Sequence, residues 1–245
     1  MRRKTNILVV GAGIMGSFHA RAVAQSDHCD LVGIVELDRE RGELLSDKHG
    51  AHWYPELPNL KSVDGVIVAT PTGSHFEIAR QIIDNGVALL LEKPLTDELE
   101  FSEKLVEMAS EKEVPLMCGF LERFNPAFLT ASRIVREPIA ISAIRHSPYT
   151  ARVKTGVCWD LLIHDIDLVL RMSPDAEVTS LSREIGFFHP DSQEGSEDLV
   201  ECLFGLSNGL IAHASASRMG HRKIRTLSIT CLLYTSDAAD EEDSV

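Results

Sequence analysis

The chain has 245 residues, a formal net charge of −13 at pH 7 and 44% hydrophobic residues. This length allows about two domains of ordinary size, each with a hydrophobic core. The acidity argues against nucleic acid or an anionic membrane surface as a partner, because both attract basic proteins. No apolar run is long enough to cross a bilayer, and the run after the basic residues 2–4 is too short for a secretory signal.

The five cysteines are dispersed along the chain and form no C-x-x-C pair. Such spacing suggests neither a zinc site nor a disulfide framework. We therefore expect no bound metal, reduced thiols and a cytoplasmic protein.

A dinucleotide-binding pattern opens the chain. The apolar run 6–10 is typical of a buried parallel strand, and it leads into G-A-G-I-M-G at residues 11–16 and a helical pattern that continues to Gln25. A second apolar run, 31–35, ends in Glu36 at the spacing expected of the acid that binds a ribose 2′-hydroxyl. A strand, a glycine turn, a helix and this acid together predict a dinucleotide site.

Each position of the glycine turn has a predicted task. Gly11 would allow the tight turn, Gly13 would let the backbone approach a pyrophosphate, and Gly16 would let the helix pack closely on the strand. Ile14 and Met15 begin the helix, whose unpaired N–H groups would bind the phosphates. The alternative is a glycine turn that binds nothing.

Glu36 also bears on which cofactor is bound. A carboxylate accepts hydrogen bonds from the ribose of NAD and would repel the 2′-phosphate of NADP. NAD is therefore the expected cofactor, while Arg39 and Arg41 leave NADP as the alternative.

Strands and helices alternate up to about residue 118. Strands are expected near 66–69, 88–91 and 114–118, and helices over 39–49, 74–85 and from Thr96, as N-cap, to Lys112. A Pro-containing loop is expected before the strand at 66–69. The alternation predicts an α/β domain, residues 1–118, with a doubly wound parallel Rossmann sheet.

Polar residues follow two of these strands, at the edge of the sheet where ligands bind. Thr70 and Pro71 end the strand at 66–69, and Glu92-Lys93-Pro94 follow the strand at 88–91. We expect the Lys93 ammonium to point into the site; the alternative is a structural ion pair with Glu92.

The pattern changes beyond Gly119. A helix to about Arg136 is followed by an apolar strand at 139–144, a helix over 159–172, and strands near 178–183, 199–204, 210–216 and 224–229. Strands that follow one another without helices predict a mostly antiparallel open sheet, hence a second, α+β domain over residues 119–230.

The helix predicted over residues 159–172 carries a polar stripe. Asp160, His164, Asp167 and Arg171 follow one another at helical spacing, while most other positions are apolar. A helix this apolar is largely buried, so its polar stripe would face a cavity or a partner. A histidine beside a carboxylate provides the proton acceptor that a cofactor domain lacks. The alternative is a core histidine satisfied by its neighbour.

The last residues differ from the pattern before them. Residues 231–241 resemble one reading frame through a transposon-end adapter used in preparing sequencing libraries, so we expect the gene's own reading to end near Thr230. Residues 231–245 would then be a non-native tail. The alternative is a disordered acidic tail of the protein itself.

These motifs, in this order, resemble the glucose-fructose oxidoreductase, inositol dehydrogenase and MocA (Gfo/Idh/MocA) family. The resemblance rests on residues 11–16, Thr70-Pro71 with His75, Glu92-Lys93-Pro94 and residues 160–164, and it spans most of residues 5–230. It implies an N-terminal Rossmann domain and a C-terminal open sheet that often mediates oligomerisation, with a homodimer or homotetramer expected for the full-length protein. It also implies NAD(P)-dependent oxidation or reduction of sugars and cyclitols.

The resemblance implies roles for individual residues. The expected catalytic residues are Lys93, which holds the substrate oxygen, His164, the base, and Asp160, which orients His164 or a substrate hydroxyl. His75 and Glu92 join the cofactor-binding set together with Thr70, Pro71, Lys93 and the glycine turn.

A finer resemblance concerns the substrate. Residues 123–126, Arg152, 156–157, 164–167 and 222–225 resemble members that oxidise the nucleotide sugar UDP-N-acetylglucosamine at C3. Beside Asp160 and His164, the expected ligands of such an anionic substrate are Arg123, Asn125 and Arg152. Each of these three could equally be a surface or interdomain residue.

Three rival readings stay open. The chain could be an inositol or simple-sugar dehydrogenase of the same family, or a non-catalytic regulatory protein that binds NAD. The third is that the chain lacks the final elements of its second sheet, exposes apolar strand edges and is inactive although its parent is an enzyme.

Overall fold

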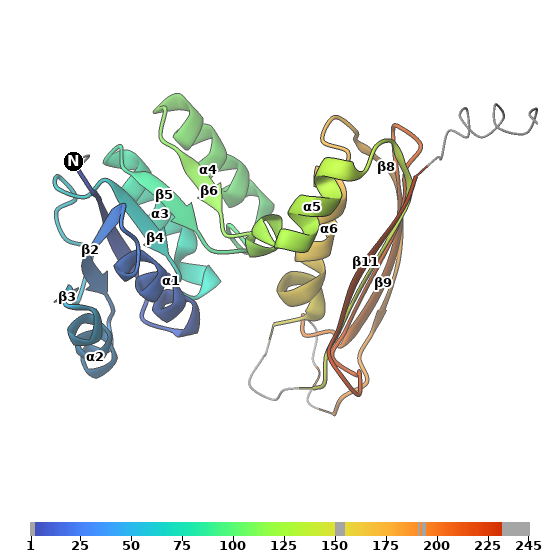
Figure 1. The fold of residues 1–245 in the computed structure, drawn as a ribbon. Coiled ribbons are helices and arrows are strands. Elements are labelled where there is room, and N and C mark those ends of the chain that lie inside the picture. Colours follow the sequence, from blue (N-terminus) through green and yellow to red (C-terminus); the bar gives the residue numbers. More distant parts are fainter. Residues whose placement is uncertain (1–2, 150–154, 191, 193–194, 232–245) are drawn as a thin grey trace, which may run out of the picture. The chain divides into compact units, whose positions relative to one another are not determined.

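The computed structural model describes residues 3–149, 155–190, 192 and 195–231. The chain divides into two compact units, a first unit of residues 1–120 and a second unit that begins at Leu121 (Figure 1). The tail expected over 231–245 lies outside the described residues, apart from Cys231. Among the described residues, no helix combines the length and apolarity needed to span a membrane.

The first unit contains a six-stranded parallel sheet. Its strands, in the spatial order β3-β2-β1-β4-β5-β6, are β3 (His52–Tyr54), β2 (Cys29–Val35), β1 (Thr5–Val10), β4 (Gly65–Val68), β5 (Ala88–Leu91) and β6 (Leu116–Cys118). This order reverses direction between β1 and β4, as in a doubly wound dinucleotide-binding sheet, and confirms the predicted fold class. The short strand β3 lies where the sequence suggested only a loop.

Helices cover both faces of this sheet. Ala20 and Val23 of α1 (Ile14–Ala24) and Leu45 of α2 (Arg39–His49) pack on one face. Buried residues of α3 (His75–Asp84), which follows the 3₁₀ turn Thr72–Ser74, and of α4 (Leu99–Glu111) pack on the other. The strands are therefore buried on both sides, which explains why they appear in the sequence as continuous apolar runs.

The start of α4 differs from the prediction. The helix begins at Leu99, preceded by Glu98 in an extended conformation, so the expected N-cap at Thr96 is wrong. The Thr96 hydroxyl instead bonds the Glu98 carbonyl at 2.5 Å and lies 2.6 Å from the Ser102 hydroxyl. A cap must accept a hydrogen bond from a backbone N–H of the first turn, and here the hydroxyl donates to a carbonyl.

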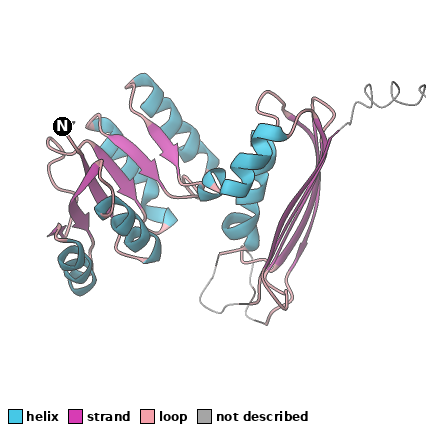
Figure 2. Cartoon of the chain, in the orientation of Figure 1, coloured by secondary structure: helices cyan, strands magenta, loops and turns pink. Residues whose placement is uncertain are grey.

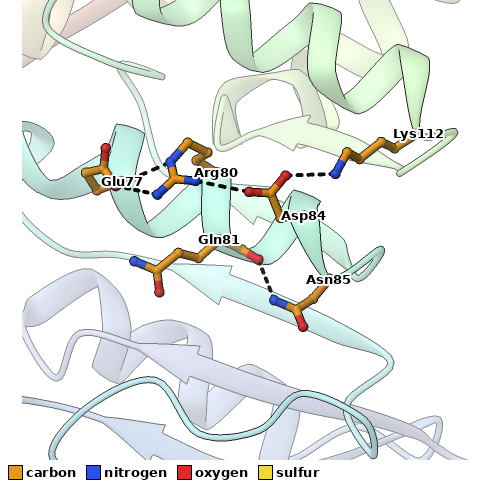
Figure 3. A network of polar contacts seen from close by, with 6 residues as sticks. All are labelled: Glu77, Arg80, Gln81, Asp84, Asn85 and Lys112. Atoms are coloured by element: carbon orange, nitrogen blue, oxygen red, sulfur yellow. Dashed lines mark hydrogen bonds and ion pairs between the residues drawn. The ribbon is translucent and has the colours of Figure 1, made fainter.

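A charged network links α3 to the end of α4 (Figure 3). Arg80 binds Glu77 at 3.0 Å and Asp84 at 3.1 Å, and Lys112 binds the other oxygen of Asp84 at 2.7 Å. The hydrogen bond from Lys112 lowers the pKa of Asp84. Because all four side chains are exposed, the network adds little to stability, and packing between the helices dominates.

The second unit contains a five-stranded sheet in the order β11-β7-β10-β9-β8. Its elements in chain order are a 3₁₀ turn (Leu121–Phe124), α5 (Pro126–Ile134), β7 (Pro138–His146), a π-helical turn (Cys158–Leu162), α6 (Ile163–Arg171), β8 (Val178–Gly186), β9 (Leu199–Leu206), β10 (Ile211–Ser217) and β11 (Ile224–Cys231). Only the β7–β10 pair is parallel, which confirms the mostly antiparallel sheet.

The described helices of the second unit lie on one face of its sheet (Figure 2). Val157, Leu162 and Val169 pack there against buried residues of β7, β9 and β10. On the opposite face, Leu203 and Ile211 are 51% and 56% exposed. Within the described residues the sheet is thus covered on one side only.

Arg145 is a buried cation in this core. Its guanidinium binds both Asp165 oxygens at 2.8 Å and a Glu122 oxygen at 2.9 Å. Burial disfavours the charge, but the hydrogen bonds and charges of Asp165 and Glu122 outweigh burial and raise the Arg145 pKa. The cluster joins β7 to α6 and to the 3₁₀ turn before α5.

Arg145→Gln should therefore destabilise the second unit strongly, by about 3–5 kcal/mol, because it leaves two carboxylates buried without their cation. Denaturant unfolding followed by circular dichroism measures the loss. Arg183→Gln, at an exposed arginine of the edge strand β8, is the matched control and should change stability by no more than about 0.5 kcal/mol. Equal effects of the two substitutions would contradict this account.

Two carboxylates of the second unit have lowered pKa values. Burial would raise the pKa of Glu122, but hydrogen bonds from Arg145 and Asn125 lower it overall. Burial would likewise raise the pKa of Asp198, but the backbone N–H groups of His189 and Phe188 donate to its carboxylate, each at 2.8 Å, and lower it.

These shifts predict acid sensitivity. A carboxylate with a depressed folded pKa stabilises fully above its unfolded pKa, about 4 for Asp and Glu, and this contribution disappears as pH falls through the folded pKa. Urea midpoints should fall between about pH 5 and about pH 3. Glu122→Gln should flatten this dependence; an unchanged slope would show that Glu122 does not contribute.

Candidate active site

The glycine turn after β1 is shaped by close backbone contacts. Gly11 has φ +99° and donates a hydrogen bond to the Val35 carbonyl at 2.8 Å, and a Cβ there would lie 2.6 Å from the Ala69 carbonyl oxygen. A Cβ at Gly16 would overlap the Gly11 carbonyl. Glycine is thus required at both positions, one for the turn and one for the approach of α1 to it.

Gly13 differs from its two neighbours. It is the N-cap of α1, and an added Cβ would meet nothing within 4 Å. Ile14 and Met15 begin the helix behind it, so the unpaired N–H groups of the first turn are next to this space. The missing side chain leaves a cradle beside a helix N-terminus, which fits the pyrophosphate of a dinucleotide.

Glu36, the first residue after β2, lies beside this turn. One carboxylate oxygen accepts from Ala12 N–H at 2.8 Å, and the other from Asp38 N–H at 3.0 Å and from Arg41 at 3.2 Å. The expected acid and the glycine turn are therefore in contact. The backbone bonds hold the carboxylate at the place where the adenosine ribose of a dinucleotide lies in this fold.

Arg39 and Arg41, the two arginines that left NADP as the alternative cofactor, have different partners. Arg41 pairs with Glu36, whereas Arg39 binds Glu43 at 2.9 Å and stacks over Trp53 at 5.6 Å. Because Arg41 pairs with Glu36, its charge is partly neutralised where a 2′-phosphate would need it.

The ends of β4 and β5 lie at the same edge as the glycine turn, because all three strands are parallel and hydrogen-bonded in series. Glu92, the residue after β5, is buried, and its carboxylate lies 2.7 Å from His19 Nε2 of α1. The other oxygen accepts from Lys93 N–H at 3.2 Å. Glu92 thus joins α1 to the segment that carries Lys93, a partly buried side chain.

His75 lies beneath this edge and joins two strand ends. Its ring is 1% exposed, with Nε2 at 2.9 Å from the Thr70 carbonyl and Nδ1 at 3.0 Å from the Pro94 carbonyl and 3.2 Å from the Leu95 carbonyl. Both ring nitrogens are engaged with the backbone. His75, expected among the cofactor ligands, therefore supports the two loops and does not present its ring at the surface.

Thr70 and Pro71 form the loop after β4. The Thr70 hydroxyl accepts a hydrogen bond from Ser74 at 2.8 Å, while Pro71 is exposed and precedes the 3₁₀ turn. Both residues are at the switch point between β1 and β4, where the fold leaves a crevice for a ligand.

In the second unit, the segment with Asp160 and His164 is not one regular helix. Asp160 lies in the π-helical turn, and His164 is the second residue of α6. The helix expected over 159–172 is therefore present, but its first turn is π-helical, and the ideal stripe does not extend to Asp160. π-helical turns are rare and are frequent at functional sites.

Two acidic residues of the expected stripe, Asp160 and Asp167, form ion pairs with arginines. The Asp160 carboxylate accepts from Arg218 at 2.9 Å, and Asp167, which is buried, binds Arg123 Nε at 2.8 Å and Nη2 at 2.5 Å. Asp167 thus faces a cation of the same unit.

The predicted substrate ligands take part in local structure. Arg123 forms this fork with Asp167, and Asn125 caps α5 by accepting from Ala127 N–H at 3.0 Å while donating to Glu122 at 3.1 Å. Arg152 lies outside the described residues. Arg123 and Asn125 therefore both have partners within the second unit.

Thiol chemistry is not suggested at Cys158, the first residue of the π-helical turn. Burial, followed by the Glu197 carboxylate, raises the Cys158 pKa to about 12, so the group stays a neutral thiol. Among the described residues, no group of three or more His, Cys, Asp or Glu side chains is arranged to hold a metal ion.

Three residues at these sites escaped the sequence interpretation: His19, Glu197 and Arg218. Each contacts an expected site segment from far away in the sequence, and no periodicity links them to it. His19 had a weak signal, since it is on α1 one turn after Gly16.

Comparisons with known proteins agree with this geometry. A family model described as an oxidoreductase family with an NAD-binding Rossmann fold matches residues 5–120, and the GFO/IDH/MocA C-terminal domain matches residues 138–232. A UDP-N-acetylglucosamine 3-dehydrogenase of Acidithiobacillus ferrooxidans is 30% identical, covering 90% of this chain and 69% of its own. A scyllo-inositol 2-dehydrogenase (NAD⁺) of Bacillus subtilis is 29% identical, covering 89% and 68%.

A solved structure of the Acidithiobacillus ferrooxidans UDP-N-acetylglucosamine 3-dehydrogenase superposes with a TM-score of 0.87 at 29% identity. The match covers 94% of this chain and 75% of that one.

The variant Gly13→Ala distinguishes an effect on NAD binding from an effect on folding stability. Gly13 has φ −73° and ψ −165°, which alanine adopts without strain, so the variant should melt like the wild type. Its methyl group would occupy the phosphate cradle, and NAD affinity measured by calorimetry should fall by at least about tenfold. Gly16→Ala, in contrast, should lose stability as well. A folded Gly13→Ala variant with unchanged NAD affinity would contradict the cradle.

Proposed function

This chain belongs to the Gfo/Idh/MocA family of NAD-binding oxidoreductases, and we propose that it transfers hydride between nicotinamide and a secondary alcohol of a sugar. The observation that carries the proposal is the first unit's cradle: a glycine turn with open space at Gly13, a helix N-terminus behind it and Glu36 beside it. The residues of this cradle fit a dinucleotide, and the family supplies the reaction class.

We propose UDP-N-acetylglucosamine, oxidised at C3, as the substrate. The 30% identical relative named for this activity supports it, as do the residues that resemble such enzymes. Inositol is the second candidate, because a relative of almost equal identity is named a scyllo-inositol 2-dehydrogenase. Both substrates offer a ring secondary alcohol, so the same catalytic groups suit either.

When bound, a nicotinamide cofactor would supply the hydride acceptor or donor of the proposed reaction. His164 takes the proton of the substrate hydroxyl, and Lys93 donates a hydrogen bond to the same oxygen and stabilises negative charge as it develops. Asp160 orients His164 or a second hydroxyl. Lys93 belongs to the first unit and His164 to the second.

NAD is the proposed cofactor, with NADP as the alternative. The Glu36 carboxylate supports this choice, since it would repel a 2′-phosphate, and Arg41 is paired with it. Residues 1–118 would bind the cofactor, and residues 119–230 would bind substrate and form the contacts of a homodimer or homotetramer. The free cysteines fit a cytoplasmic setting.

A substrate panel tests the function. The chain is incubated with NAD or NADP and with UDP-N-acetylglucosamine, simple hexoses, myo-inositol or scyllo-inositol, and reduced nicotinamide is followed by its absorbance. We expect turnover with NAD and the nucleotide sugar. Turnover with inositols alone would replace the proposed substrate, and NAD binding without turnover of any alcohol would favour a non-catalytic role.

His164→Ala should leave NAD affinity nearly unchanged while turnover falls by roughly 10²- to 10⁴-fold, the usual contribution of a general base. Lys93→Ala should be at least as damaging. NAD titration and steady-state kinetics measure the two effects separately. His213→Ala, at a half-buried histidine of β10, is the matched control and should keep its turnover. Comparable turnover in the wild type and His164→Ala would defeat the assignment.

A further inference from the structure

We propose that Arg218 is a positioning residue for the second unit's catalytic groups. Its guanidinium would hold the Asp160 carboxylate, and with it the π-helical turn before His164, in the orientation that the reaction uses. The inference rests on the proposed function, because Asp160 and His164 receive their roles there.

Arg218 is an unusual cation for its place. It directly follows β10, and its side chain is 6% exposed. Its backbone is held by a 2.8 Å hydrogen bond from Arg218 N–H to the Asp198 carbonyl. A guanidinium withdrawn from water to this extent is retained only where it is paired and hydrogen-bonded.

Among the described residues, the hydrogen-bond partners of the Arg218 guanidinium belong to the segment that leads into α6. Nη2 donates to Asp160 at 2.9 Å, and Nη1 donates to the Thr155 carbonyl. One rigid fork thus bonds the chain before the π-helical turn and the carboxylate within it. A lysine, with a single ammonium, could not reproduce both contacts in this geometry.

The π-helical turn needs such external contacts. A π-helical turn interrupts the regular α-helical pattern, so contacts from outside it help determine where its side chains point. Glu197 supplies a second anchor: its carboxylate accepts from Cys158 N–H at 2.8 Å, and its carbonyl accepts from Val157 N–H at 3.0 Å. A Cβ at Gly156 would overlap the same carboxylate, so glycine is needed for this close packing.

The exposures of the pair point to a role beyond stability. The Asp160 side chain is 33% exposed, whereas that of Arg218 is 6% exposed. The cation is therefore withdrawn from solvent, while the carboxylate that it holds is partly exposed.

A double-mutant cycle tests the inference. Arg218→Gln, Asp160→Asn and the double variant are compared in kcat, in KM for NAD and in melting temperature. Arg218→Lys is a second variant in case Arg218→Gln folds poorly, and Arg183→Gln on β8 is the matched control, expected to keep kcat within about twofold.

If Arg218 acts through Asp160, Arg218→Gln should lower kcat by about 10²-fold with KM for NAD unchanged, as displacement of a catalytic group does. In the Asp160→Asn background it should cost less than about threefold. Arg218→Lys should recover only part of the loss. Additive losses in kcat, or a loss in melting temperature with kcat per folded molecule unchanged, would overturn the inference.

The same experiment distinguishes a failure of the proposed function from a failure of the role proposed for Arg218. If the wild type turns over no alcohol, that proposal fails, and the melting temperatures of the same four chains still decide whether Arg218 holds Asp160. Non-additive melting losses support the clamp, and additive losses overturn it.

Discussion

The first unit depends on the close approach of α1 to the glycine turn. A single methyl group at Gly16 would overlap the Gly11 carbonyl, and one at Gly11 would strike the Ala69 carbonyl. Only with this backbone contact in place does the helix N-terminus lie beside the open space at Gly13. The bonds from Ala12 to Glu36 and from His19 to Glu92 then tie the same turn and helix to the ends of β2 and β5. One steric constraint thereby organises the whole sheet edge.

The second unit is organised by buried and partly buried charges. Arg145, Arg123 and Arg218 each bind a carboxylate of the helical segment 158–171, so three cations from different elements determine how that segment lies on its sheet. Buried pairs of this kind add little net stability compared with apolar packing, but breaking one is costly. Their value is specificity of arrangement, because each fork fixes one carboxylate of the segment against a cation of a different element.

The two units therefore position their functional groups by different kinds of contact. Backbone hydrogen bonds and glycine contacts shape the cofactor cradle, where the ligand has a constant chemical form. Side-chain forks and the irregular π-helical turn shape the helical segment of the second unit. Positioning by side chains can change by single substitutions.

The sequence by itself determined the parts whose causes are local. Continuous apolar strands, the glycine turn and the change of rhythm after residue 119 specify a doubly wound sheet followed by a mostly antiparallel one, because strand burial and turn sterics depend on near neighbours. Tertiary structure alone decided the rest: β3, the helix start at Leu99, and the pairing of Arg123 with Asp167 and of Arg218 with Asp160. A short strand forms only against its neighbour, and an ion pair across 58 residues leaves no periodic trace in the chain.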